Sequence, residues 1–148
     1  MDAVVLLPGQ GERIEAGPIT TTMKATAATT GGAFSLSEGT LPAGMSGPPP
    51  HAHRETTDTY YVLEGTLHLT VGGRELDAPA GSYILVPPGV VHTFANTSDG
   101  PVRLLNLNAP GGWEHYLREL AGAMRAGTFP GTAEFARLVA KYDFVVPA

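Results

Sequence analysis

Apolar and polar residues alternate with a period of two along most of residues 20–108, and short turns interrupt the alternation. Runs of about four to eight residues that alternate in this way, bounded by Gly, Pro, Asn or Asp, are typical of β-strands. We therefore expect strands at residues 4–7, 20–30, 34–41, 58–65, 66–71, 74–76, 82–86, 92–96 and 102–108. Short strands with no helix between them predict an antiparallel sandwich or barrel.

The period changes to three and four after residue 110. Two groups of apolar residues recur at these intervals: Trp113, Tyr116, Leu117, Leu120 and Met124, then Phe135, Leu138, Val139 and Tyr142. Each group predicts an amphipathic helix, and Thr132 is placed to cap the second one. Because two such helices cannot bury their apolar faces alone, we expect them to cover a flank of the strands or the mouth between them. Residues 1–110 would form a β-barrel, and residues 111–148 a helical extension packed on it within the same domain.

Composition narrows the class of partner. A chain of 148 residues is long enough for one domain with its own core, and the absence of cysteine excludes disulfide bonds and a thiol nucleophile. A net charge of −5 at pH 7, with scattered Lys and Arg, argues against a nucleic acid or an anionic membrane as partner. Residues 3–7 are too short for a signal-peptide core, and no stretch approaches the roughly 20 apolar residues of a membrane span. We expect a cytoplasmic protein that binds a small neutral or weakly charged molecule.

Three histidines and one aspartate between residues 48 and 96 carry the candidate chemistry. His51 and His53 are two residues apart, so in an extended backbone both imidazoles leave the same face, about 6.6 Å apart along the strand. Asp58 opens the next strand, and His92 follows a Pro-Pro-Gly turn. Three imidazole nitrogens and a carboxylate oxygen would suit one divalent ion of iron, manganese, cobalt, nickel, copper or zinc, and ligand type alone does not choose among them. The alternative is a set of histidines hydrogen-bonded within a core.

These two segments resemble the paired motifs of the cupin family, G-x5-H-x-H-x3-4-E-x6-G and G-x5-P-x-G-x2-H-x3-N. The second motif is matched at every position, by Gly81, Pro87, Gly89, His92 and Asn96. In the first, His51, His53 and Gly65 match, but three rather than five residues separate Gly47 from His51, and Asp58 stands where the family has Glu. The resemblance covers roughly residues 20–108. It implies an all-β fold, the double-stranded β-helix or cupin jelly-roll barrel, to which the two C-terminal helices are appended, and a metal held by His51, His53, His92 and the acidic residue.

Asp58 has two possible roles. Its side chain is one methylene shorter than Glu, which removes about 1.5 Å of reach, so it could stop short of the metal and act instead as a general base beside it. Glu55 shares the strand parity of His51 and His53 and is a rival ligand. We interpret Glu55 as a charge at the rim near Arg54, and we favour the base role for Asp58.

Strand parity also predicts which side chains line the cavity and which face outward. The predicted lining residues are Tyr60, Val62, Phe94 and Asn96, with Met45, Ile84 and Val86 as weaker candidates. Tyr61 and Leu63 have the opposite parity. Together with residues 4–7 they offer more apolar surface than a monomer should expose, and cupins commonly pair through such a face, so we expect a homodimer.

The small size and the C-terminal helices make this arrangement similar to the quercetin-dioxygenase-like cupins. The resemblance implies metal-dependent dioxygenation of a small aromatic or polyketide-like substrate, with Asp58 as the catalytic residue that takes a substrate proton. One alternative is a redox-neutral isomerase or cyclase in which the metal acts as a Lewis acid. Another is a cupin that binds a ligand without catalysis. The fold does not choose among these functions.

Overall fold

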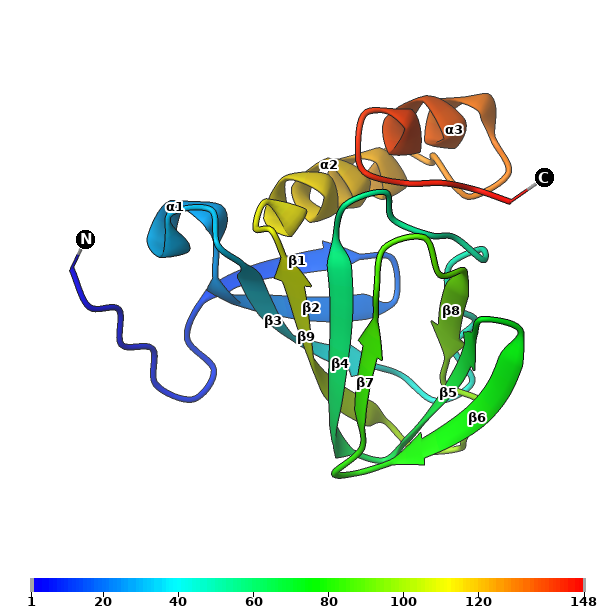
Figure 1. The fold of residues 1–148 in the computed structure, drawn as a ribbon, viewed down its shortest axis with the longest axis horizontal. Coiled ribbons are helices and arrows are strands. Elements are labelled where there is room, and N and C mark those ends of the chain that lie inside the picture. Colours follow the sequence, from blue (N-terminus) through cyan, green and yellow to red (C-terminus); the bar gives the residue numbers. More distant parts are fainter. Residues whose placement is uncertain (1, 148) are drawn as a thin grey trace.

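The strands form two antiparallel sheets that face each other in a jelly-roll-like sandwich (Figure 1). A computed structural model describes residues 2–147. Its elements are β1 (Glu12–Ala16), β2 (Ile19–Ala25), α1 (Ala27–Thr30), β3 (Ser35–Leu41), β4 (Thr57–Glu64), β5 (Thr66–Val71), β6 (Arg74–Pro79), β7 (Tyr83–Val86), β8 (His92–Ala95), β9 (Val102–Ala109), α2 (Trp113–Arg125) and α3 (Ala133–Ala140). The larger sheet has the order β1-β2-β3-β9-β4-β7 and the smaller one β6-β5-β8. The expected all-β fold with C-terminal helices is confirmed, although the sheets do not close into a barrel.

The core lies between the two sheets and follows the strand alternation. Tyr60 and Val62 of β4 point inward from the larger sheet and are 3% and 0% exposed. Leu67 and Leu69 of β5 meet them from the smaller sheet and are fully buried. Burial of such side chains stabilises the fold by about 1.5–3 kcal/mol each.

The inward positions of β3 carry small residues. Ser35 and Ser37 are buried, and Gly39 follows them at the same parity. Side chains this small leave the space between β3 and the opposite wall unfilled. The cavity described below occupies that space.

A second apolar cluster joins α2 to the edge of the larger sheet. It consists of Ile14, Ala16 and Met23 from β1 and β2 with Leu117, Leu120, Ala121 and Met124 from α2. Both C-terminal helices lie together at one end of the sheets, at the top of the view, and residues 2–10 extend away from the body to the left (Figure 1). No helix within residues 2–147 has the length and hydropathy that a membrane crossing requires.

Two strand predictions are corrected by the structure. Residues 4–7 form no strand and are exposed, with Val5 at 78%. The strand expected over residues 20–30 ends at Ala25, because the Thr26 N–H donates to Thr29 Oγ1 (3.0 Å) and starts the single turn of α1, which Gly31 ends at φ 64°. Conversely, β1 was not predicted, since only Ile14 and Ala16 in it are buried.

Candidate metal centre and its cavity

Backbone pairing brings the two histidine segments together. His51 and His92 form an isolated antiparallel bridge: the His51 N–H donates to the His92 carbonyl (3.0 Å) and the His92 N–H to the His51 carbonyl (2.8 Å). The Gly89 N–H donates to the His53 carbonyl (2.8 Å), which anchors the turn before His92. A Cβ at Gly47 would lie 1.4 Å from the Phe94 carbonyl oxygen, so only glycine lets this loop pass β8 so closely.

The four predicted ligand side chains converge in the interior. His51, His53, Asp58 and His92 each offer a ligand atom, and these atoms all lie within 4.8 Å of one another. All four residues are buried, with exposures of 7%, 2%, 2% and 1%. Glu55 is exposed and is not in this group, which agrees with its interpretation as a rim charge.

Each imidazole is oriented by a backbone carbonyl. Nδ1 of His51 lies 2.9 Å from the Pro49 oxygen, Nδ1 of His53 lies 2.8 Å from the Asp143 oxygen, and Nδ1 of His92 lies 3.0 Å from the Val90 oxygen. A carbonyl only accepts, so the proton sits on Nδ1 in all three rings. Nε2 then carries a lone pair, as in histidines that bind metals.

The Asp58 carboxylate faces two of these nitrogens. Its Oδ2 lies 3.1 Å from His92 Nε2 and 3.6 Å from His53 Nε2. Carboxylate and imidazole would present lone pairs to one another unless a cation or an added proton lies between them. His53 Nε2 is buried without a hydrogen-bond partner, which is costly in a metal-free interior. The cluster therefore fits a single metal site of a cupin.

The distances from Asp58 Oδ2 to the two imidazoles show whether the shorter side chain can reach a shared metal. Two ligands bound to one metal at about 2.1 Å lie roughly 3 to 3.5 Å apart. The separations of Oδ2 from the two imidazoles fall close to this range. The missing methylene of Asp58 therefore does not take its carboxylate out of the cluster, contrary to the expectation that the arm stops short.

Neighbouring donors hold the Asp58 carboxylate ionised and fix its orientation. Oδ2 accepts from the Tyr60 hydroxyl (2.7 Å), and Oδ1 accepts from the side-chain amides of Asn106 (2.6 Å) and Asn108 (2.9 Å). Burial opposes ionisation, but the imidazoles of His53 and His92 and these donors keep the pKa of Asp58 well below its usual range. The two asparagines were missed from the sequence; the signal available was that they share the parity of the apolar Val102 and Leu104 in β9.

The pKa values of two of the imidazoles shift in opposite directions. It lowers the pKa of His51 to about 4, since the nearby His92 and His53 add to the desolvation. For His53, burial acts in the same direction, but Asp58 and Asp143 together outweigh it and raise the pKa. The Tyr60 hydroxyl is buried beside the same negative charge, which raises its pKa well above 10.

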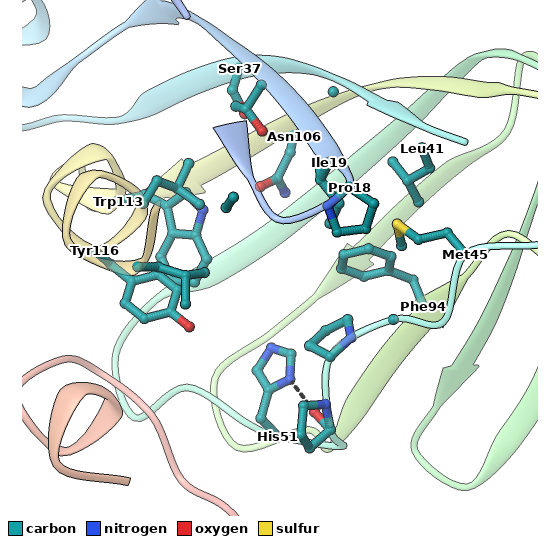
Figure 2. Close-up of a pocket in the computed structure, with 18 of the residues that line it drawn as sticks. Pro18, Ile19, Ser37, Leu41, Met45, His51, Phe94, Asn106, Trp113 and Tyr116 are labelled. Carbon is teal, nitrogen blue, oxygen red and sulfur yellow. Dashed lines mark hydrogen bonds between the residues drawn. The ribbon is translucent and has the colours of Figure 1, made fainter. Parts of the chain in front are cut away.

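A cavity of about 340 Å³ opens beside the cluster, and His51, Asp58 and Asn106 form its polar edge. Trp113 and Tyr116 reach from α2 toward the space that Phe94 borders from the opposite side (Figure 2). The aromatic residues of the wall are Tyr60, Phe94, Trp113, Tyr116, Phe135 and Phe144. Among the described residues, no lysine or arginine lines this cavity.

Only part of the predicted lining is found there. Tyr60 and Phe94 lie on the wall, as does Met45. Val62 is sealed in the core at 0% exposure, and so is the Asn96 side chain.

The Asn96 amide instead donates to the carbonyls of Leu41 (3.1 Å), Pro42 (3.0 Å) and Gly100 (2.8 Å). Asn96 therefore fixes loops. The weaker candidates Ile84 and Val86 pack in or against the core between the sheets.

The comparisons with known proteins agree with this architecture. Residues 37–108 match the family model described as a cupin domain. A quercetin 2,3-dioxygenase of Bacillus subtilis is 28% identical over 126 residues, which are 85% of this chain but 37% of that protein. The chain thus spans little more than a third of this relative.

Two solved structures share the fold. KdgF from Halomonas sp. superposes with a TM-score of 0.67 at 12% identity, covering 77% of this chain and 99% of KdgF. The polyketide cyclase RemF from Streptomyces resistomycificus superposes with a TM-score of 0.63 at 23% identity, covering 73% of this chain and 80% of RemF.

Proposed function

We propose that this chain is a cupin, because residues 37–108 match the cupin domain model, and that it is a metal-dependent enzyme acting on a small aromatic or polyketide-like molecule, by quercetinase-like dioxygenation. The observation that carries this proposal is the aromatic cavity whose polar edge is His51 and Asp58. The similarity to a quercetin 2,3-dioxygenase over 85% of the chain supports it.

The wall of the cavity favours a neutral ring system. No lysine or arginine lines the described cavity, so only the metal itself could pair with a substrate carboxylate or phosphate, and the rest of the wall suits uncharged groups. A volume of about 340 Å³ is at the lower end for small-molecule sites. Aromatic rings at Phe94, Trp113 and Phe144 can stack on a flat substrate.

The residues of the cluster would have separate roles in metal binding and proton transfer. His51, His53 and His92 would hold the metal through Nε2, with Asp58 Oδ2 completing the set. When bound, the metal would supply a Lewis acid for substrate oxygens and, if redox-active, a path for electrons to dioxygen. Where Oδ2 does not bind the metal, it would instead take the proton of a substrate hydroxyl, because Oδ1 already accepts from the amides of Asn106 and Asn108. Tyr60, through its hydroxyl bond to Oδ2, would keep the carboxylate oriented for that transfer.

The test is an assay of flavonol turnover by metal-free protein loaded separately with each candidate divalent ion. We expect loss of flavonol and uptake of dioxygen in equal molar amounts with at least one ion. His92→Ala should abolish both, while His68→Ala, on a half-buried strand position paired with Asp77, should leave both unchanged. No flavonol loss with any ion would contradict the proposal.

A redox-neutral isomerase or cyclase is the second candidate, and the proton-accepting Asp58 favours it equally. Turnover of a hydroxylated polyketide without dioxygen would identify this class. Trp113, the single tryptophan, lines the cavity, so its fluorescence would report ligand binding without turnover. That result would identify a binding protein. The homodimer and the cytoplasmic location stay predictions.

A further inference from the structure

The C-terminal segment pairs with the stretch that carries two of the three imidazoles. Residues 142–146, the C-terminal strap, run beside residues 51–56. The Ala52 N–H donates to the Val145 carbonyl (2.8 Å) and the Val145 N–H to the Ala52 carbonyl (2.7 Å). The sequence motif around His51 and His53 gave no sign of this pairing, because its two members are far apart in the chain.

Asp143 makes the largest set of polar contacts in the strap. Its backbone carbonyl is the acceptor for His53 Nδ1 (2.8 Å). Its carboxylate accepts from three successive backbone N–H groups: Oδ1 from Arg54 (2.7 Å), and Oδ2 from Glu55 (3.0 Å) and Thr56 (2.8 Å). One residue therefore binds both the histidine ring and the backbone that follows it.

These contacts matter because His53 has little other support. Residue 53 belongs to no strand, and its Nε2 is buried without a partner. A carboxylate that accepts several N–H groups forms charge-assisted bonds, which are about twice as strong as neutral ones. The anchored carbonyl then keeps the proton on Nδ1 and directs the Nε2 lone pair toward Asp58 and His92.

Phe144, the next residue of the strap, contacts two imidazoles and also lines the cavity. Its ring centroid lies 5.1 Å from that of His53 and 5.4 Å from that of His51. On its other side it contacts Tyr116, with centroids 4.7 Å apart. The strap therefore shields the imidazoles with an aromatic ring as well as orienting one of them.

We propose that Asp143 is a positioning residue of the metal centre, acting through its carbonyl on His53 and through its carboxylate on the backbone of residues 54–56. The inference rests on the metal site proposed above. It requires metal binding but no particular reaction.

The test compares Zn²⁺ affinity and the visible spectrum of the Co²⁺ form in wild-type protein and in Asp143→Ala. Without the carboxylate, the Asp143 carbonyl is no longer anchored beside His53, and loss of an orienting partner of a histidine ligand raises the metal dissociation constant about 10- to 100-fold. We expect this increase, together with an altered Co²⁺ spectrum that a merely destabilised fold would not produce. Asp143→Asn offers one acceptor oxygen in place of two, so we expect an intermediate effect.

Glu134→Ala is the matched control, since it removes a carboxylate of α3 that pairs only with Arg137. It should leave the affinity and the spectrum unchanged. If Asp143→Ala binds Zn²⁺ and Co²⁺ like the wild type, the positioning role is refuted while the metal site stands. Wild-type protein that binds neither ion would refute the site and the inference together.

A measurement on the metal-free wild type covers the case in which Asp143→Ala does not fold. Nitrogen-15 NMR of the imidazoles distinguishes the two neutral tautomers. We expect His53 to carry its proton on Nδ1. A proton on Nε2 would show that the Asp143 carbonyl does not orient the ring.

Discussion

At the scale of single residues, Asp58 shows how a shorter acid can occupy a site where the cupin motif has Glu. Donors from β4 and β9 hold its carboxylate: Tyr60 on one oxygen, Asn106 and Asn108 on the other. The remaining lone pair of Oδ2 faces the imidazoles of His53 and His92. This one free lone pair can face a cation or accept a proton from a substrate in the cavity, but not both at once.

Replacing Asp58 by Asn should impair both roles. We expect turnover to fall by about 10²–10⁴-fold at saturating metal, the contribution of a general base. The metal dissociation constant should rise, because a charged oxygen donor is lost. Elemental analysis beside turnover separates the two effects, and Asp58→Glu, which keeps the charge, is the control for metal binding. An Asn variant with full activity would remove Asp58 from the mechanism.

Glu114 gives a prediction about pH. It is a buried carboxylate at the start of α2 that accepts from the Ser35 hydroxyl (2.6 Å) and the Ala27 N–H (2.8 Å). Burial opposes its ionisation, but these bonds prevail and lower its pKa. A lowered pKa in the folded state means that the carboxylate stabilises the fold above its unfolded pKa of about 4.3, and that this contribution is lost as pH falls through the folded value.

We therefore expect Glu114→Gln to lower the free energy of unfolding by about 1–3 kcal/mol near neutral pH. The difference from the wild type should narrow as pH falls below about 4. Urea unfolding at several pH values measures it. Glu134→Gln, at an exposed position, should show no such pH-dependent difference, and a constant gap for Glu114→Gln across the range would contradict the assignment.

At the scale of elements, the sequence predicts a strand when one of its faces packs on the core and the other does not. It does not predict a strand whose burial depends on a partner far away in the chain. The alternation of β4, β5 and β9 reflects a core on one side only. By contrast, β1 buries only Ile14 and Ala16, and it does so against α2, about a hundred residues further on. The Thr- and Ala-rich run after Met23 suits a strand and a capped turn alike, so local preference could not decide between them.

The candidate site also contains residues that the sequence could predict and residues that it could not. His51, His53, Asp58 and His92 were found because their spacing around turns is local. Asn106, Asn108 and Asp143 were not, because each acts across strands or through the strap and no motif marks it. The helices were expected only to cover a flank of the strands or the mouth between them, and no contact of the strap with the cavity was predicted.

Removing the helices tests their contribution to the fold. A chain truncated after Ala109 loses α2, so Ile14, Ala16 and Met23 are left exposed, and the cavity opens to solvent. We expect loss of soluble protein, judged by the soluble fraction and the melting temperature. Phe129→Ser, at a half-exposed position between the helices, should have little effect. Soluble truncated protein with an unchanged melting temperature would show that the helices contribute no stability.

At the scale of the whole molecule, apolar side chains gather on the outer face of the larger sheet. Tyr83 and Leu85 of β7 are 62% and 49% exposed, and Tyr61 of β4 lies opposite Tyr83 in register and is 42% exposed. Leu105 of β9 is the neighbour of Tyr61 on its other side. Leu63 shares the outward parity and is partly covered.

We expect two chains to associate through this outer face. Light scattering at micromolar concentration should give the mass of a dimer, and the melting temperature should rise with protein concentration. Tyr83→Lys should shift the mass toward a monomer. Val91→Lys, exposed on the loop before β8, is the control and should not. A monomer mass for the wild type would refute the dimer.

The bridge between the C-terminal strap and residues 51–56 also has a kinetic consequence. The contact of His53 with Asp143 joins residues 90 positions apart, and the entropy of closing so long a loop delays its formation during folding. The strap lies at the margin of the fold and is held by two bridge bonds, by Asp143 and by the ring of Phe144, so it can open while the sheets stay intact. The Ala52 and Val145 amide hydrogens would then exchange through this local opening. Because this opening frees only His53, a metal held also by His51, Asp58 and His92 would leave more slowly than the strap opens.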